Sequence, residues 1–441
     1  MAGEWKDTSL AEVSDDVAYG YTESASAERV GPRFLRITDI QNGVVDWHTV
    51  PFCPISEADH QRYRLYSGDI VVARTGNSTG ENYLFQGAED AVYASYLIRF
   101  RVNQRVADPA FVWYCMRTQS WQAFINSSKT GSAQAGANAK VLGRFQLALP
   151  PLAQQKAIAA VLGALDDKIE LNRRMNATLE AMARALFQSW FVDFDPVRAK
   201  LDGRQPIGLD ETTATLFPDS FQDSAVGHIP NGWRVGVLDE LTKFVIGGDW
   251  GATEPTDDET VSCYCIRGAD IPSLQSGGVG KMPTRFLKPS SVEKRQLADG
   301  DVAIEISGGS PTQCTGRPVL ASDALLQSLG QPLVASNFCR ILKLKSPALS
   351  KFVYLWLRQL YDLGELFQFE TGTTGIKNFA FVIFSERYPL VVPDLRVAEA
   401  FDRALSPFFV RIQANSKQSR TLATLRDTLL PKLLSGELSV I

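Results

Sequence analysis

The sequence repeats itself at long range, and this repetition constrains the fold more than any other feature. Two segments of the 441-residue chain carry apolar residues at the same spacing, with a constant offset of 243 positions. The matched pairs are Ile158 and Phe401, Leu162 and Leu405, Leu165 and Phe408, Ile169 and Ile412, Asn172 and Asn415, Leu179 and Leu422, Met182 and Leu425, and Leu186 and Leu429. A repeat of this kind indicates two copies of one architecture.

The stretches that precede the two periodic segments also correspond, although more loosely. The motifs at residues 36–40 and 68–71 recur at 267–271 and 300–303, while the loops between them differ in content. The sequence therefore predicts an α+β protein with two mixed α/β domains, related by pseudo-two-fold symmetry and separated by two long antiparallel coiled-coil helices. The expected parts are a first domain at 1–150, a central spacer helix at 151–195, a linker at 196–230, a second domain at 231–392 and a C-terminal spacer helix at 393–441.

The periodic segments predict long helices that pack against each other. After Pro151 the chain has no proline for about 40 residues, which at ~1.5 Å each would form a rod on the order of 60 Å. Asn172 and Asn415 interrupt the apolar seam at equivalent positions, and a polar seam residue fixes the register of a helix pair. Two separate amphipathic helices, each lying on its own domain, are the alternative. Ser406 and Pro407 fall inside the second segment, so that helix is expected to be kinked or built in two pieces.

Composition is typical of a globular protein and does not by itself favour nucleic-acid binding. Hydrophobic residues make up 45% of the chain, and no apolar run is long enough to cross a bilayer. The six cysteines lack disulfide-framework spacing and the N-terminus lacks an export signal, so we expect a reducing cytoplasm. The formal net charge of −4 argues against DNA binding when considered alone, because phosphate contacts favour basic proteins. An acidic DNA reader would need localised basic surfaces or a more basic partner on the duplex.

Signatures of catalysis and of metal binding are mostly missing from the sequence. It contains neither the Asn-Pro-Pro-aromatic motif of amino-methyltransferases nor a nuclease-like cluster of carboxylates with lysine. Residues 277–282 resemble a phosphate loop, but Met282 stands where Ser or Thr must hold magnesium. Only three histidines occur, and Cys263 and Cys265 have no second pair at ligand spacing, which favours thiols on a buried strand. The aromatic residues at 111–124 are interpreted as core residues.

Polar loops that follow predicted strands are the candidates for contacting DNA, whose symmetry matches a molecule with two similar heads. Arginine reads guanine and asparagine reads adenine through paired hydrogen bonds, while Ser and Thr reach bases or phosphates. For each loop, a plain surface connection is the alternative interpretation. The candidate DNA-binding residues are Arg74, Thr75, Asn77, Ser78, Lys129, Gln134, Asn138 and Lys140 in the first copy, and Arg267, Thr312, Gln313, Arg317, Lys377 and Asn378 in the second.

The helical regions and the linker also carry a family resemblance. The stretches concerned are Leu-Pro-Pro-Leu-Ala-Gln-Gln at 149–155, Leu-Asp-Asp-Lys-Ile-Glu-Leu-Asn at 165–172, Leu-Phe-Gln-Ser-Trp-Phe-Val-Asp-Phe-Asp-Pro at 186–196, Ile-Pro-Asn-Gly-Trp at 229–233 and Leu-Arg-Asp-Thr-Leu-Leu-Pro-Lys-Leu-Leu-Ser-Gly at 425–436. In them the chain closely resembles the DNA specificity subunit of type I restriction-modification systems. The resemblance extends over essentially the whole chain, but within the two domains it is confined to framework positions.

This resemblance implies two target recognition domains, each reading half of a bipartite DNA site, and two helices that set the gap between the halves. The seam residues from Ile158 to Leu186 and from Leu405 to Leu429 would form the helix pair and a partner interface. The implied partners are double-stranded DNA, two methyltransferase subunits and restriction (motor-nuclease) subunits, without a membrane. The chain itself would be non-catalytic and would hold no cofactor. S-adenosylmethionine would serve the adenine methyltransferase, and ATP with magnesium the motor-nuclease.

Two other hypotheses belong to different classes of protein. One is a single-chain restriction or methylation enzyme, against which the missing methyltransferase and nuclease motifs argue. The other is a protein-interaction scaffold that does not contact DNA, which a neighbouring adenine methyltransferase gene would make less attractive.

Overall fold

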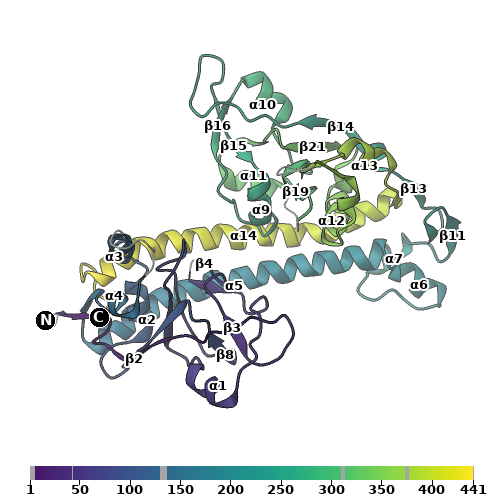
Figure 1. Cartoon of the computed structure of the whole chain (residues 1–441). Helices are drawn as coiled ribbons and strands as arrows, with labels where there is room; N and C mark the ends of the chain where they lie inside the picture. Colours follow the sequence, from purple (N-terminus) through teal and green to yellow (C-terminus); the bar gives the residue numbers. More distant parts are fainter. Residues whose placement is uncertain (1–4, 42, 130–136, 309–312, 373–376, 441) are drawn as a thin grey trace. The chain divides into compact units, whose positions relative to one another are not determined.

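Figure 1 shows the computed structural model of the chain, which describes residues 5–41, 43–129, 137–308, 313–372 and 377–440. The chain divides into two compact units, residues 1–169 with 421–441 and residues 170–420. Two helices of 40 residues, α5 (Leu152–Phe191) and α14 (Leu395–Leu434), contribute a segment to each unit. No helix in these described stretches has the length and apolar character needed to span a membrane.

The first unit is built on a four-stranded antiparallel sheet. Its strand order is β2 (Ser14–Tyr19), β9 (Leu97–Val102), β6 (Asp69–Ala73) and β7 (Asn82–Leu84). The other pairs are parallel β3 (Arg33–Leu35) with β8 (Ala91–Tyr93), antiparallel β1 (Lys6–Ser9) with β10 (Gln146–Leu149), and β4 (Ile40–Gln41) with β5 (Val44–Val45). The shorter helices are α1 (Glu57–Tyr63), α2 (Pro109–Cys115), α3 (Gln119–Lys129) and α4 (Ala139–Leu142).

Strand β6 is apolar along its length because both of its faces are buried. Ile70 and Val72 belong to the core that contains α2, whereas Val71 and Ala73 belong to the core under β3 and β8. This arrangement explains why the sequence shows a continuous apolar run here instead of alternation.

The second unit contains the matching sheet. Its order is β14 (Thr242–Gly247), β21 (Cys339–Leu344), β17 (Val302–Glu305) and β19 (Pro318–Leu320). Further strands are β15 (Val261–Ile266), parallel to β20 (Leu333–Ala335) and antiparallel to β16 (Thr284–Leu287), the pair β13 (Arg234–Gly236) with β24 (Leu390–Val392), and β18 (Ser307–Gly308), β23 (Lys377–Phe379) and β22 (Glu370–Thr371). The shorter helices are α8 (Leu238–Leu241), η1 (Gly268–Asp270), α9 (Ile271–Gln275), α10 (Pro289–Arg295), α11 (Asp323–Leu329), η2 (Pro347–Leu349), α12 (Ser350–Asp362), η3 (Glu365–Phe369) and α13 (Phe381–Arg387).

The repeated topology is the structural form of the sequence repeat. The order β14–β21–β17–β19 follows that of β2–β9–β6–β7, and β2 has a register shift between Ser14 and Asp16 that recurs at the matching point of β14. Gly68 and Gly300 adopt φ angles of +93° and +85° just before β6 and β17, in the left-handed region that favours glycine. The mixed helix and strand class predicted from the sequence is confirmed.

In the first unit the segments of α5 and α14 pack antiparallel through aliphatic side chains. Ile158 and Leu162 lie in one core with Leu430 and Leu433. The first unit also contains Trp5, whose ring packs against this core and lies 3.3 Å from the position that a Cβ on Gly436 would take.

In the second unit the same two helices pack through aromatic rings. The ring centroids of Phe187, Trp190 and Phe191 lie 6.3, 5.4 and 4.8 Å from that of Phe401. Leu405 belongs to the same core. The helix pair is therefore aliphatic in one unit and aromatic in the other.

The asparagines of the seam form a buried polar network in the second unit. The side-chain amide of Asn172 donates to the backbone carbonyl of Asn415 over 3.3 Å. The amide of Asn415 donates to Asn176 Oδ1 over 2.9 Å, and that of Asn176 donates to Ser416 Oγ over 2.9 Å. Because such bonds form only in one alignment, they hold the helices in register, as the sequence pattern predicts.

Two expected seam residues lie outside the seam. Met182 and Leu425, which match each other in the repeat, are both 45% exposed. Their neighbours Ala183 and Arg426 take the inward positions: Ala183 is buried, and Arg426 donates to Asp166 of α5 over 2.6 Å. The sequence pattern placed Met182 and Leu425 in the seam because it considered only large apolar residues at a spacing of three or four. It therefore overlooked the small Ala183 and the charged Arg426.

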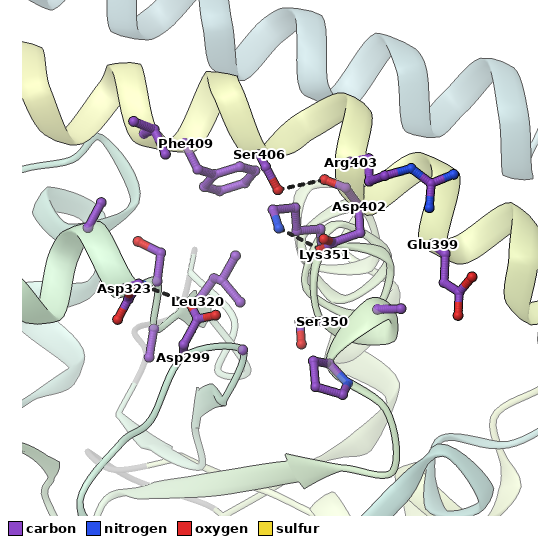
Figure 2. Close-up of a pocket in the computed structure, with 17 residues that line it drawn as sticks. Asp299, Leu320, Asp323, Ser350, Lys351, Glu399, Asp402, Arg403, Ser406 and Phe409 are labelled. Atoms are coloured by element: carbon purple, nitrogen blue, oxygen red, sulfur yellow. Dashed lines mark hydrogen bonds and ion pairs between the residues drawn. The ribbon is translucent and has the colours of Figure 1, made fainter. Parts of the chain in front are cut away.

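Helix α14 continues through Ser406 and Pro407, so of the two expected alternatives a helix in two pieces is wrong, and a kink stays a prediction. Pro407 cannot donate to the carbonyl of Arg403, but the Ser406 hydroxyl donates to the Asp402 carbonyl over 2.8 Å. The Asp402 side chain accepts from Lys351 of α12 over 2.5 Å. Figure 2 shows both contacts beside a cavity of about 350 Å³ between α14, α12 and two neighbouring loops. Contacts with the second domain thus support the helix where the proline weakens it.

The stretch at 196–230, expected as a linker, contains secondary structure of its own. It forms α6 (Asp195–Leu201), α7 (Glu211–Thr215) and the hairpin of β11 (Phe221–Ser224) with β12 (Gly227–Pro230). Val197, Phe217 and Ile229 are buried in the core that contains Phe191. This stretch therefore anchors the end of α5 in the second unit.

Candidate nucleic-acid interface

In the first unit the structure brings two of the predicted polar loops together. Arg74 follows β6, and its backbone carbonyl accepts from the backbone N–H of Ala137 over 2.9 Å. The N–H of Ala139 donates to the hydroxyl of Tyr19 at the end of β2 over 3.0 Å. Residues 74–80 and 137–140, far apart in the sequence, thus meet at one end of the four-stranded sheet.

The side chains at this end of the sheet differ in their exposure and in the hydrogen bonds that already engage them. Asn77 and Lys140 are exposed, and Thr75 and Ser78 are half-buried. Asn138 is exposed, but its side-chain oxygen accepts from the N–H of Val141 over 2.9 Å and caps α4. Its amide group is thereby committed in part to the fold.

Arg74 has the most constrained position among these candidates. Its Nε donates to the carbonyl of Ser95 over 3.0 Å. Its guanidinium carbon lies 5.2 Å from the ring centroid of Tyr19 and 5.8 Å from that of Tyr96. The two tyrosines were not predicted from the sequence, although aromatic residues next to polar loops at strand ends offered a weak signal.

In the second unit two predicted loops meet through strand pairing. β18 pairs with β23, and Ser307 donates through its hydroxyl to Asn378 Oδ1. Lys377 forms an ion pair with Glu370 at 2.7 Å, which neutralises much of its charge locally. Gln313 is exposed. The side chain of Lys129, and residues Gln134 and Thr312, lie outside the part of the chain that the structure describes.

Two arginines of the second unit have structural partners instead of free donors. Arg317 is only 8% exposed and binds both carboxylate oxygens of Glu305, at 2.8 and 2.7 Å. Its prediction as a DNA-contacting residue is wrong for this structure, because burial in an ion pair leaves the guanidinium inaccessible. Arg267 binds Asp270 and the carbonyl of Lys281. The hydrogen bond that Arg267 donates to the carboxylate of Asp270 raises the pKa of Arg267.

The counterpart of Arg267 in the first unit behaves in the same way. Arg36 binds both carboxylate oxygens of Asp39, at 3.0 and 2.7 Å. This Arg–Asp pair closes a turn in both copies. Arg267 is therefore part of the repeated framework, and its prediction as a DNA-binding residue is not favoured.

The groups that could support catalysis are few in the described residues. These residues contain no cluster of three or more His, Cys, Asp or Glu side chains arranged for a metal ion. All six cysteines are buried free thiols, and burial raises the pKa of Cys265 and Cys339 to about 12. The aromatic residues Trp121 and Phe111 are fully buried core residues, as predicted. The loop ends described above offer hydrogen-bond donors and acceptors, which suit recognition.

Comparisons with known proteins agree on one family. Residues 4–181 match the family model described as the type I restriction modification DNA specificity domain. The chain is 23% identical to the type I restriction enzyme HindI specificity subunit of Haemophilus influenzae, over 99% of this chain and 100% of the relative. It is also 23% identical to the MjaIX specificity subunit of Methanocaldococcus jannaschii, over 85% of this chain and 76% of the relative.

A solved structure supports the same fold. The crystal structure of the type I restriction-modification system S subunit from M. genitalium matches with a TM-score of 0.54 and 15% identity, over 97% of this chain and 96% of that one. The family model over the first domain and helix and the full-length relatives agree with each other. The chain is similar to type I restriction-modification DNA specificity subunits over most of its length.

Proposed function

We propose that this chain is the non-catalytic specificity subunit of a type I restriction-modification complex. It binds a bipartite DNA sequence, with each of its two domains reading one half. It also scaffolds two adenine methyltransferase subunits and the restriction subunits. The observation that carries the proposal is the duplicated domain, in which one framework presents different polar loops at the same end of the sheet.

The duplication suits DNA because a framework can stay constant while its loops diverge. Equivalent frameworks approach the duplex in equivalent ways, and the side chains on the loops decide which bases are accepted. The two long helices would then set the gap between the half-sites, and their buried asparagine network would keep that gap constant.

The partners and cofactors follow from this division of labour. S-adenosylmethionine would bind to the methyltransferase subunits, and ATP with magnesium to the motor-nuclease subunits. The formal charge of −4 fits a subunit that shares the duplex with partners that contact phosphates. The exposed outer faces of α5 and α14, including Met182 and Leu425, are candidates for holding these subunits.

Methylome sequencing tests the proposal directly. The chain would be expressed with its neighbouring methyltransferase gene in a host that lacks adenine methylation. We expect a bipartite motif with a fixed gap, and exchanging only residues 1–150 for those of a relative should change one half of it. A soluble complex that methylates no specific motif would contradict the proposal, as would methyl transfer by the purified chain alone.

A further inference from the structure

Arg74 differs from three other arginines of its domain in what holds it, and like Arg33 it is held by a backbone carbonyl and an aromatic ring. Arg36, Arg99 and Arg101 each form an ion pair with a carboxylate, of Asp39, Asp16 and Asp69 respectively. Arg74 has no carboxylate partner among the described residues. Its charge is therefore available to a ligand, whereas the other three are neutralised within the protein.

The geometry leaves one end of the Arg74 guanidinium to be used. Its Nε is committed to the carbonyl of Ser95, and its two terminal nitrogens have no hydrogen-bond partner in the described part of the chain. With Nε held, the two terminal nitrogens remain as a planar fork that can donate to two neighbouring acceptors.

The two tyrosines fix this fork before any ligand arrives. Tyr19 and Tyr96 are 43% and 55% exposed, and their rings lie on the guanidinium. The hydroxyl of Tyr19 accepts from Ala139 N–H, which restrains that ring. A side chain already ordered in the free protein loses less conformational entropy on binding.

The second domain has the same backbone but different side chains at these positions. The N–H of Arg74 donates to the carbonyl of Tyr96, and the N–H of Ile306 donates in the same way to the carbonyl of Phe338. Ile306 and Phe338 therefore occupy the places of Arg74 and Tyr96. Because isoleucine offers no donors, a function of the Arg74 fork is confined to one half of the molecule.

We propose that Arg74 reads a guanine in the half-site of the first domain, and that Tyr19 and Tyr96 are the positioning residues that aim it. This inference rests on the proposed function and names a base within it. Guanine presents two neighbouring acceptors, O6 and N7, in the major groove, which match a planar fork. Adenine offers one acceptor beside a donor, and cytosine offers a donor, so neither satisfies both nitrogens. A phosphate would accept the same charge without needing a fixed plane.

The experiment uses the full chain with its methyltransferase and compares methylated motifs. Arg74→Ala should relax one guanine of one half-site and leave the other half unchanged. Discrimination at that position should fall by about 5-fold to 150-fold, the range for a bidentate contact. Tyr96→Ala should relax the same position to a smaller degree, while Tyr96→Phe, which keeps the ring, should behave like the unaltered protein.

A matched control separates charge from readout. Arg105 is exposed in the turn after β9, at the opposite end of the same sheet, so Arg105→Ala removes the same charge. We expect it to leave the motif unchanged. If Tyr96→Ala weakened the complex without relaxing any position, the tyrosine would have only a structural role and the inference would be overturned in that part.

Chemically modified duplexes distinguish a contact of Arg74 with the guanine base from a contact with a backbone phosphate. Replacing the guanine by 7-deazaguanine should weaken binding of the unaltered complex but cost the Arg74→Ala complex nothing more. If a methylphosphonate instead abolished the effect of Arg74→Ala, the residue would contact phosphate and the inference would be wrong. Failure of the unaltered complex to methylate any motif would count against the proposed function itself.

Discussion

Arginine side chains take three different roles in this protein, and the partner of each side chain determines its role. Arg317 is buried on Glu305, Arg267 closes a repeated turn on Asp270, and Arg74 lies between two tyrosines with its terminal nitrogens unpaired among the described residues. Arg74 and Arg267 directly follow a strand, and Arg317 directly precedes one. Residue type alone therefore cannot separate a framework arginine from a ligand-binding one.

Removal of Arg317 should destabilise the second unit strongly. Arg317→Met leaves the carboxylate of Glu305 buried without a partner, which costs about 3–5 kcal/mol. Urea unfolding would measure the loss. The control is Lys288→Ala, which breaks the exposed ion pair with Asp258 and should leave the stability almost unchanged, because solvent screens that pair. Equal effects of the two variants would contradict a buried role for Arg317.

Glu180 gives a pH dependence whose sign follows from its surroundings. Burial raises the pKa of Glu180, while Arg358 and Arg184 lower it by less. Its Oε1 has no hydrogen-bond partner among the described residues. A raised folded-state pKa means that the unfolded chain loses its proton first, so this group reduces stability as pH rises from below its ordinary pKa through the raised value.

Glu180→Gln should therefore stabilise the protein at neutral pH. The difference between the variant and the unaltered protein should shrink as the pH falls below the ordinary pKa of glutamate, where both side chains are neutral. Thermal unfolding across this pH range is the measurement. A variant that is less stable at neutral pH would show that attraction to the arginines outweighs burial.

At the scale of elements, the two long helices combine strong and weak points. The network of Asn172, Asn176 and Asn415 fixes their register, because a slip by one turn would leave buried amides unpaired. Pro407 weakens α14 nearby, and the Lys351–Asp402 contact supports it from outside. Register is thus specified inside the pair, and continuity of α14 is supported by the domain.

Pro407→Ala should stabilise the second unit. Pro407 is exposed, so its removal loses little packing, and alanine restores a donor for the Arg403 carbonyl. We expect a gain of about 1–3 kcal/mol in unfolding free energy, within the cost of an interior proline. Pro289→Ala is the control, since Pro289 begins α10 where no helical hydrogen bond is missing. A loss on Pro407→Ala would indicate that the surrounding structure requires the proline.

At the scale of the whole molecule, the two copies have become unequal where their helices pack. Leu430 and Leu433 in the first unit correspond by the repeat to Phe187 and Trp190 in the second. The facing residue differs between the copies in the same way. Ile158 packs against the leucines in the first unit, and Phe401 packs against the aromatic rings in the second. Such complementary differences favour pairing within one chain over pairing between chains.

A fragment of residues 1–196 tests this asymmetry. Its single helix could pair with that of a second copy, but Phe187 and Trp190 would then lie against Ile158 and Leu162, where leucines fit. We expect weak dimers, and a variant with Phe187→Leu and Trp190→Leu should dimerise at least about 10-fold more tightly. Sedimentation equilibrium would measure both. Two strictly monomeric fragments would contradict the argument.

The sequence predicted the repeated features well and the long-range contacts poorly. The glycine–aspartate turns before β6 and β17 and the seam asparagines were visible because both copies carry them. The Arg317–Glu305 pair and the tyrosines around Arg74 were missed, because each depends on how one copy folds. Met182 and Leu425 were misplaced since apolar spacing ignores small residues such as Ala183.

Trp5 and Gly436, which lie near opposite ends of the sequence, are close neighbours within the first unit. A short linker joining the two ends would close a ring in which domain, helix and connector each occur twice. Opening that ring between Ile207, which is 93% exposed, and Gly208 would give a chain in which the second domain precedes the first. Such a permuted protein should assemble and direct methylation to the same motif. The order of the domains along the gene is then a matter of where the ring was cut.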